Sequence, residues 1–180
     1  DMVTDTVTAP IKSLVFSGID DTVTLNDDGN PFNGLNRATA AGSGTTVDFV
    51  DATTSLTVLF GDGNDTWNYV GQDPAAGATI TLNGQDGTDT IDASVMPAGV
   101  VLVGGDDDDT LTGSNFDDTI SGNDGDDEID GSLGTDLLVE TANVDFTLTD
   151  TTLDGVGMDT LNSIEQAQLT GGFSANTIDA

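Results

Sequence analysis

The chain of 180 residues contains no cysteine and no histidine. Without cysteine it can form neither a disulfide nor a thiolate metal site, and without histidine it lacks the usual general base and transition-metal ligand. Lys12 and Arg37 are the only basic residues beside 33 acidic ones, so the net charge is −31. We therefore expect neither nucleic acid nor an anionic membrane surface as a direct partner.

Long apolar runs and glutamate are also scarce. No run approaches the length that crosses a bilayer, so we expect no membrane insertion. Glutamate occurs only at Glu128, Glu140 and Glu165, and aspartate supplies the other 30 acids. A merely solvated acidic surface would use both residues, whereas aspartate is the shorter carboxylate that turns and metal-binding loops favour. No apolar series has helical spacing for more than two turns, so little or no helix is expected.

Residues 104–139 repeat every nine residues. They read GGDDDDTLT, GSNFDDTIS, GNDGDDEID and GSLGTDLLV, with glycine first, aspartate sixth and a large aliphatic residue eighth. Glycine and aspartate favour turns, and alternating threonine and aliphatic residues favour a short strand. Nine residues are too few for a unit containing a helix. We therefore predict an all-β parallel solenoid in which two units make one coil.

A weaker form of the same signature, Asp-Thr followed by an apolar residue, recurs outside this block. The sixth-position residues then form two series, each with a spacing of roughly one coil. We predict two ladders of turns on opposite edges of the solenoid. The first contains Asp65, Asp89, Asp109 and Asp127, and the second contains Asp118, Asp136, Asp159 and finally Asn176.

The repeats predict one elongated domain over residues 1–180, with about nine short coils at the strand spacing of a β-sheet. Residues 104–139 are its strict core. Residues 26–44 break the rhythm and are predicted to be a loop that leaves the solenoid. Both ends of the chain fall in mid-repeat, so we expect a fragment of a longer repeat protein.

Stacked aspartates create an electrostatic problem. At a separation of about 5 Å, Coulomb's law gives roughly 1 kcal/mol of repulsion per neighbouring pair in water and ~3 kcal/mol at an effective dielectric constant near 20. Along two ladders this is comparable with the whole stability of a small domain. A cation between the turns would remove the repulsion. Ca²⁺ suits carboxylate and carbonyl oxygens, whereas Mg²⁺ retains its waters and is the weaker candidate.

The nine-residue block resembles the repeats-in-toxin (RTX) nonapeptide Gly-Gly-x-Gly-x-Asp-x-U-x. The resemblance implies a right-handed parallel β-roll or β-helix in which several Ca²⁺ ions lie between neighbouring turns, held by the sixth-position aspartates and turn carbonyls. Ser114 and Phe116 stand where the family has glycine. The candidate metal ligands are Asp65, Asp89, Asp109, Asp118, Asp127, Asp136, Gly105, Asp107, Gly122, Asp124 and Gly131, with Asp21, Asp62, Asp86 and Asp159 on the outer coils.

Three functions are compatible with these features. The first is a calcium-stiffened structural segment of a secreted or cell-surface protein, such as an adhesin, surface-layer or extracellular matrix component, with neighbouring repeats or an extracellular glycan as further partners. The second is an accessory module of an exported enzyme or toxin. The third, a polysaccharide-modifying enzyme, would have only Lys12, Arg37 and Tyr69 for its chemistry. We expect no catalytic residue and therefore no enzyme. Export is implied by the family resemblance.

Overall fold

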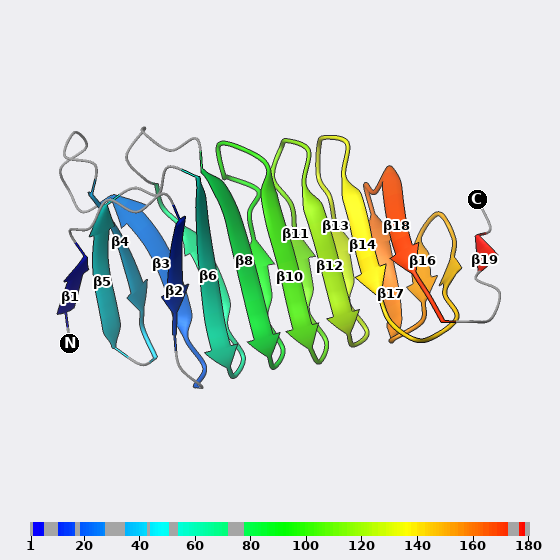
Figure 1. The fold of residues 1–180 in the computed structure, drawn as a ribbon, viewed down its shortest axis with the longest axis horizontal. Coiled ribbons are helices and arrows are strands. Elements are labelled where there is room, and N and C mark those ends of the chain that lie inside the picture. The colour runs from blue at the N-terminus through cyan, green and yellow to red at the C-terminus, as the bar shows by residue number, and fades with distance from the viewer. Residues whose placement is uncertain are drawn as a thin grey trace.

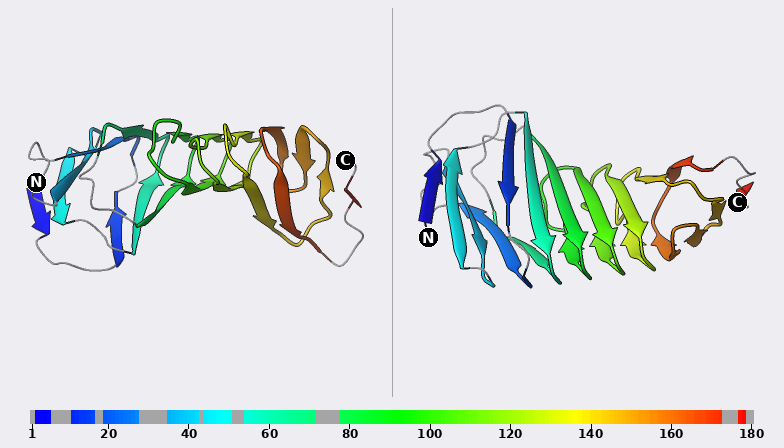
Figure 2. Two further views of the ribbon diagram at one scale, coloured as in Figure 1. Left: turned by 90° about the horizontal axis from the view of Figure 1, so that it is seen from above. Right: turned by 60° about the horizontal axis from the view of Figure 1, so that its bottom comes forward.

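The computed structural model describes residues 2–5, 11–16, 19–27, 35–42, 44–50, 54–71, 78–172 and 177–178. Within these ranges all regular structure is β-strand, in two sheets whose strands follow one another along the long axis (Figure 1). Figure 2 shows the same stacking in two further views. The prediction of an all-β parallel solenoid is confirmed.

The seven-stranded sheet is parallel throughout. Its outward side chains are mostly uncharged and its inward ones aliphatic, the alternation expected of a sheet with one buried face. In spatial order it contains β18 (Gln166–Thr170), β14 (Leu137–Thr141), β12 (Thr119–Asp124), β10 (Val100–Asp106), β8 (Thr79–Asp86), β6 (Ser55–Asp62) and β2 (Ile11–Val15).

The twelve-stranded sheet is parallel in its middle, antiparallel on either side of the middle, and parallel again at the outermost pair of strands at each end. Its spatial order is β1 (Met2–Asp5), β5 (Thr45–Val50), β4 (Leu35–Ala40), β3 (Thr22–Asp27), β7 (Thr66–Tyr69), β9 (Thr90–Asp92), β11 (Thr110–Thr112), β13 (Glu128–Asp130), β17 (Met158–Asn162), β16 (Thr152–Asp154), β15 (Thr147–Leu148) and β19 (Thr177–Ile178).

Two nonapeptides make one coil in the regular block. Leu102 on β10 pairs with Ile120 on β12, and Leu111 on β11 pairs with Ile129 on β13. Each pair joins eighth-position or equivalent residues that are two units apart in sequence. The chain thus alternates between the two sheets with every unit, as the nine-residue period predicted.

The core lies between the two sheets as two facing rows of aliphatic side chains. Leu82, Leu102, Ile120 and Leu138 line one sheet in register, and Ile91, Leu111 and Ile129 line the other; all are fully buried. Towards the amino terminus Trp67 and then Val23 continue the row of Ile91, and Trp67 stacks on Phe60 at 5.9 Å between ring centroids. Trp67 therefore fills the core and is not a surface platform.

The loop predicted for residues 26–44 is wrong for the described part of that range. Strand β4 lies antiparallel between β3 and β5 inside the twelve-stranded sheet. Its buried face carries Asn36, Ala38 and Ala40. Because these side chains are small or polar, the sequence shows almost no hydrophobic alternation here and did not predict a strand. Residues 28–34 and 43 of this range lie outside the described residues.

The carboxyl-terminal part interrupts the coil. After β14 the chain forms a short antiparallel pair, β15 with β16, before β17 rejoins the twelve-stranded sheet beside β13. Strand β15 is correspondingly short, at two residues. Residues 142–157 are thus an insertion between two coils that remain paired with each other.

The core rows generate a first prediction. Leu102→Ala removes a fully buried side chain and should lower the free energy of unfolding in saturating Ca²⁺ by about 2–5 kcal/mol. The matched control is Leu133→Ala, because Leu133 is 66% exposed and its truncation should change stability by no more than ~0.5 kcal/mol. Urea denaturation followed by circular dichroism measures both, and equal losses would contradict this assignment of the core.

Candidate metal centre

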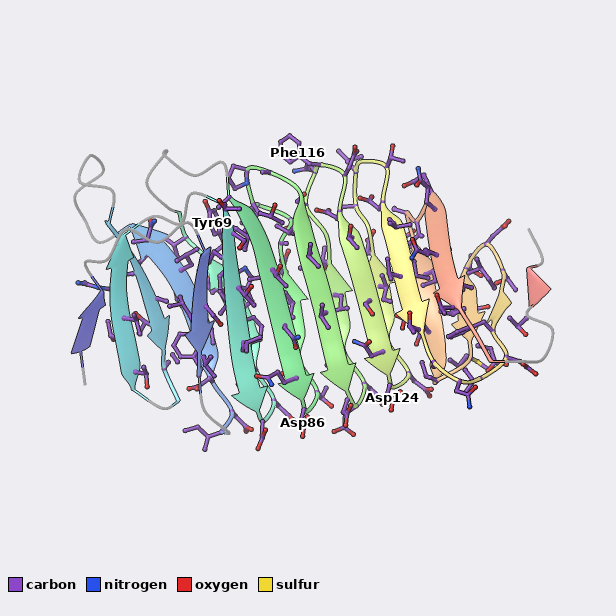
Figure 3. The ribbon with its side chains drawn as sticks, in the orientation of Figure 1. Tyr69, Asp86, Phe116 and Asp124 are labelled. Carbon is purple, nitrogen blue, oxygen red and sulfur yellow. The ribbon has the colours of Figure 1, made fainter. Side chains whose placement is uncertain are left out.

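The turns that join the two sheets lie on two opposite edges of the solenoid (Figure 3). On the first edge the chain passes from β8, β10 or β12 to the next strand of the twelve-stranded sheet, and Asp86 and Asp124 mark this edge at the bottom of Figure 3. On the second edge the chain returns, and Phe116 marks it at the top. Asp65, Asp89, Asp109 and Asp127 therefore lie on the first edge, whereas Asp118 and Asp136 lie on the second.

The sixth-position aspartates of the first edge form a continuous hydrogen-bonded ladder inside the turns. Asp65, Asp89, Asp109 and Asp127 are all buried. The backbone N–H of Asp65 donates to Asp89 Oδ1 at 2.7 Å, that of Asp89 to Asp109 Oδ1 at 2.8 Å, and that of Asp109 to Asp127 Oδ1 at 2.8 Å. Each carboxylate thus reaches back to the coil before it and fixes the register of the turns.

Asp159 extends this first ladder, not the second as predicted. The N–H of Asp127 donates to Asp159 Oδ1 at 3.2 Å, and β13 pairs with β17. The insertion of residues 142–157 is the reason, because it changes the sequence spacing while the coils stay in contact. At the other end the N–H of Asp21 donates to Asp65 Oδ1 at 2.6 Å. Asn176, predicted to end the second ladder, lies outside the described residues.

The second edge carries a shorter ladder with different partners. The N–H of Val100 donates to Asp118 Oδ1 at 2.7 Å, and the N–H of Asp118 donates to Asp136 Oδ1 at 2.8 Å. Glu165 completes it by accepting from the N–H of Asp136 at 3.0 Å. Ser114 also donates its N–H to Asp118 Oδ2 at 2.6 Å, so Asp118 has partners for both oxygens.

A second, exposed ladder runs beside the buried one, and the sequence reasoning missed it. The fifth-position residue of one coil accepts from the N–H of the fifth residue of the next coil. Asp108 accepts from Asp126 at 2.8 Å, Asp126 accepts from Met158 at 2.8 Å, and on the second edge Asp117 accepts from Thr135 at 2.9 Å. The sequence signal that could have revealed this exposed ladder is an Asp or Asn directly before the sixth-position aspartate.

Five of the buried aspartates have a second carboxylate oxygen without a hydrogen-bond partner among the described residues. This holds for Oδ2 of a series of residues that spans both edges: Asp65, Asp89, Asp109, Asp127 and Asp136. An unpaired buried carboxylate oxygen is costly, because burial removes its water and nothing replaces it. These oxygens therefore mark places where the turn requires a positively charged or protonated partner.

Glycines in the turns bring a carbonyl oxygen to the same place. A Cβ atom added to Gly84 would collide with Asp89 Oδ2 and lie 2.7 Å from the carbonyl oxygen of Gly104. A Cβ atom added to Gly104 would likewise collide with Asp109 Oδ2 and lie 2.8 Å from the carbonyl oxygen of Gly122. Each turn thus directs one carboxylate oxygen and one carbonyl oxygen of the next coil towards a single point.

The second edge repeats this arrangement at one position. A Cβ atom added to Gly113 would lie 2.6 Å from Asp118 Oδ2 and 2.7 Å from the carbonyl oxygen of Gly131. A Cβ atom added to Gly131 would lie 2.6 Å from Asp136 Oδ2 and collide with the carbonyl oxygen of Ser163. Of the turn residues predicted as ligands, Gly122 and Gly131 therefore present their carbonyl oxygens to the buried aspartates.

The remaining predicted residues lie outside this arrangement. Asp62, Asp86 and Asp124 stand in one exposed column, in register across β6, β8, β10 and β12. Asp107 is exposed as well, with a left-handed φ of 79°, and Gly105 has a φ of 140°. Their side chains do not join the buried ladder, so a role for these residues as ligands stays a prediction.

Burial dominates the electrostatics of the ladder. It raises the pKa of Asp89 to about 7, that of Asp109 to about 8 and that of Asp127 to about 6, although the backbone N–H donors act in the opposite direction. Burial also raises the pKa of Asp159 to about 7, and repulsion from Asp127 adds to the effect. The ladder thus favours bound protons or another source of positive charge.

The chemistry of these oxygens fits Ca²⁺. Among the described residues no three acidic side chains lie close enough to enclose a metal ion by themselves. An ion in these turns would be held by carboxylate oxygens of Asp89, Asp109 or Asp127 together with the glycine carbonyls. Mixed carboxylate and carbonyl ligation by oxygen alone is what Ca²⁺ prefers.

The raised pKa values predict how stability without metal depends on pH. A carboxyl whose pKa is higher in the folded state than its unfolded value of about 3.9 stabilises the fold when protonated. In EGTA the fold should therefore be most stable near pH 4 and lose stability as the pH rises through 6 to 8. Urea midpoints across this range test it. Asp109→Asn should flatten the profile, and a midpoint that rises with pH would contradict the ladder.

Comparison with known proteins agrees with this geometry over one part of the chain. The family model of the RTX calcium-binding nonapeptide repeat matches four copies, over residues 103–138. No curated protein and no solved structure matches the chain. The matched range contains Asp109, Asp118, Asp127 and Asp136 of the two ladders. Residues 103–138 are therefore RTX calcium-binding nonapeptide repeats.

Proposed function

We propose that this chain is a calcium-binding structural repeat segment of a secreted or cell-surface protein, of the adhesin, surface-layer or extracellular matrix type. The observation that carries the proposal is the repeated turn, in which an unpaired Asp Oδ2 and a glycine carbonyl of the next coil converge. It recurs at Asp89 and Asp109 on one edge and, in related form, at Asp136 on the other.

Calcium would act on this chain as a cross-link between coils. Each ion would neutralise buried carboxylates whose mutual repulsion otherwise opposes stacking, and it would tie a carboxylate to the carbonyl of the next coil. Binding energy would thereby become folding energy, because the site exists only when two coils are stacked. An extracellular setting suits such a segment, since modules outside the cell bind Ca²⁺ with dissociation constants of about 10⁻⁴–10⁻³ M.

The chain outside the nonapeptides extends the segment in both directions. The hydrogen-bonded ladder continues through Asp65 and Asp21 towards the amino terminus and through Asp159 towards the carboxyl terminus. In the described residues no helix is long and apolar enough to cross a membrane. We propose that the partners besides calcium are neighbouring repeats of the same protein or an extracellular glycan.

Calcium-coupled folding is tested by circular dichroism. In excess EGTA at pH 7.5 the chain should lose most of its β-signal, and millimolar Ca²⁺ should restore it, because the ion neutralises the ladder. Mg²⁺ at the same concentration should restore less. An unchanged β-signal on chelation and re-addition would overturn the proposal.

The buried ladder, rather than acidic charge in general, should set the calcium dependence. Asp109→Asn removes one buried carboxylate charge and should raise the Ca²⁺ concentration at half-maximal folding by about tenfold, the scale on which ligand charge tunes calcium sites. Asp106→Asn is the matched control from the same turn, because Asp106 is exposed. Equal shifts in the two variants would show that only net charge matters.

We further propose that the segment has no catalytic role. The basic and phenolic residues available for work on an anionic polysaccharide are dispersed, since Lys12 is on β2 of one sheet and Arg37 and Tyr69 are on β4 and β7 of the other. Incubation of the calcium-loaded protein with alginate or pectate should produce no absorbance from unsaturated ends. A time-dependent increase that Tyr69→Phe abolishes would overturn this part of the proposal.

A further inference from the structure

Glu140 is a buried carboxylate at the point where the regular coils end. It lies in β14, directly after the fourth nonapeptide, where the earlier units begin with glycine. Its side chain is only 2% exposed. Oε1 accepts from the N–H of Gly122 at 2.7 Å, from the N–H of Asn123 at 3.3 Å and from Ser121 Oγ at 3.4 Å. None of these bonds uses Oε2.

Asp127 approaches the same glycine with its own carboxylate. The three atoms nearest to a Cβ added at Gly122 all belong to Asp127, and Oδ2 is the closest. Asp127 is 2% exposed, and this Oδ2 has no hydrogen-bond partner among the described residues. Two buried carboxylates thus contact one residue, and one of them has an unsatisfied oxygen directed at it.

The regular coils show which oxygen the Glu140 carboxylate replaces. At Gly84 and Gly104 the carboxylate oxygen is accompanied by a glycine carbonyl from the next coil. At Gly122 no such carbonyl is among the three nearest atoms, and the residue two units further along, where the sites at Gly84 and Gly104 have glycine, is Glu140 itself. Glu140 instead presents a carboxylate on the backbone side of Gly122.

Basic side chains do not neutralise these two buried carboxylates. The sequence has only Lys12 and Arg37, and their strands β2 and β4 are near the amino-terminal end of the stack, whereas β14 is near the other end (Figure 1). The three donors to Oε1 orient the Glu140 carboxylate, but burial still raises the pKa of Glu140 because it removes water from the charged form. A divalent cation is the partner that suits both carboxylates.

We propose that Glu140 is a metal ligand that shares one divalent cation, of the size and hardness of Ca²⁺, with Asp127. This inference rests on the proposed function, since it requires calcium in the turns of the first edge. It adds a ligand of a different type: the last site of the regular block uses a glutamate carboxylate where the preceding sites use a glycine carbonyl. The extra negative charge should make this site tighter than those sites.

Isothermal titration of Ca²⁺ into the full chain tests the assignment with two matched variants. Glu140→Gln keeps the oxygen that accepts from Gly122 but removes the charge, and it should weaken the tightest class of sites by about tenfold or abolish one ion. Glu128→Gln, at an exposed glutamate on β13, should leave the titration unchanged. If the unmodified chain binds no Ca²⁺, the proposed function fails. If it binds Ca²⁺ and Glu140→Gln titrates identically, only this inference fails.

A double variant separates a shared ion from two independent effects. If Glu140 and Asp127 hold the same ion, Asp127→Asn combined with Glu140→Gln should lose no more ions than Asp127→Asn alone. An additional ion lost in the double variant would overturn the shared site.

Should Glu140→Gln fail to fold in saturating Ca²⁺, Eu³⁺ excitation spectra of the unmodified chain decide instead. The excitation energy depends on the number of carboxylate ligands, so the shared site should give a line distinct from that of the regular sites. A single line at full occupancy would overturn the proposal.

Discussion

The stacking of carboxylates at the spacing of a parallel sheet is the constraint on which this structure depends. Strands in neighbouring coils lie about 4.8 Å apart, so any residue at a fixed place in the repeat recurs at that distance. For most of the sixth-position aspartates, one oxygen accepts from the N–H of the preceding coil and the other is buried without a partner among the described residues, whereas Asp118 has partners for both. The same side chain therefore fixes the register of the coils and opposes their stacking until its charge is neutralised.

Several rows of acidic side chains run along the solenoid, and the electrostatic cost of stacking is concentrated on the buried row. Asp106 and Asp108 stand in exposed rows where water screens their charges, whereas Asp109 between the sheets is buried. Burial raises the pKa of Asp89 to about 7 and that of Asp109 to about 8, and this loss of water contributes more than repulsion between neighbours. Protons and calcium ions compete for that row, so the stability of the fold is tied to the composition of the solution rather than to its net charge of −31.

The sequence predicted the regular part of the fold well because a strict nine-residue period leaves little choice of register. A shift of one residue would carry Leu111 and Ile120 to the solvent face. Strand β4 (Leu35–Ala40) was not predicted, because Ala38 and Ala40 are buried but are too small to produce a clear hydrophobic pattern. Asp159 was assigned to the wrong edge because sequence spacing counts inserted residues, whereas the ladder depends only on which turns are stacked.

The insertion shows what a coil must supply. Residues 142–157 interrupt the regular coil, yet β13 and β17 pair in register and Asp159 still accepts from the N–H of Asp127. A coil can therefore vary in length, provided that its aspartate still accepts a hydrogen bond from the backbone N–H of the preceding turn. The coil that follows the insertion also returns a carbonyl oxygen, since that of Ser163 lies beside Gly131 together with Asp136 Oδ2. Glu140 stands before the insertion, in register with Gly122, and its side chain is longer than the aspartates used elsewhere. This length lets its carboxylate accept from the N–H of Gly122 and gives a physical reason for glutamate at this point of the chain.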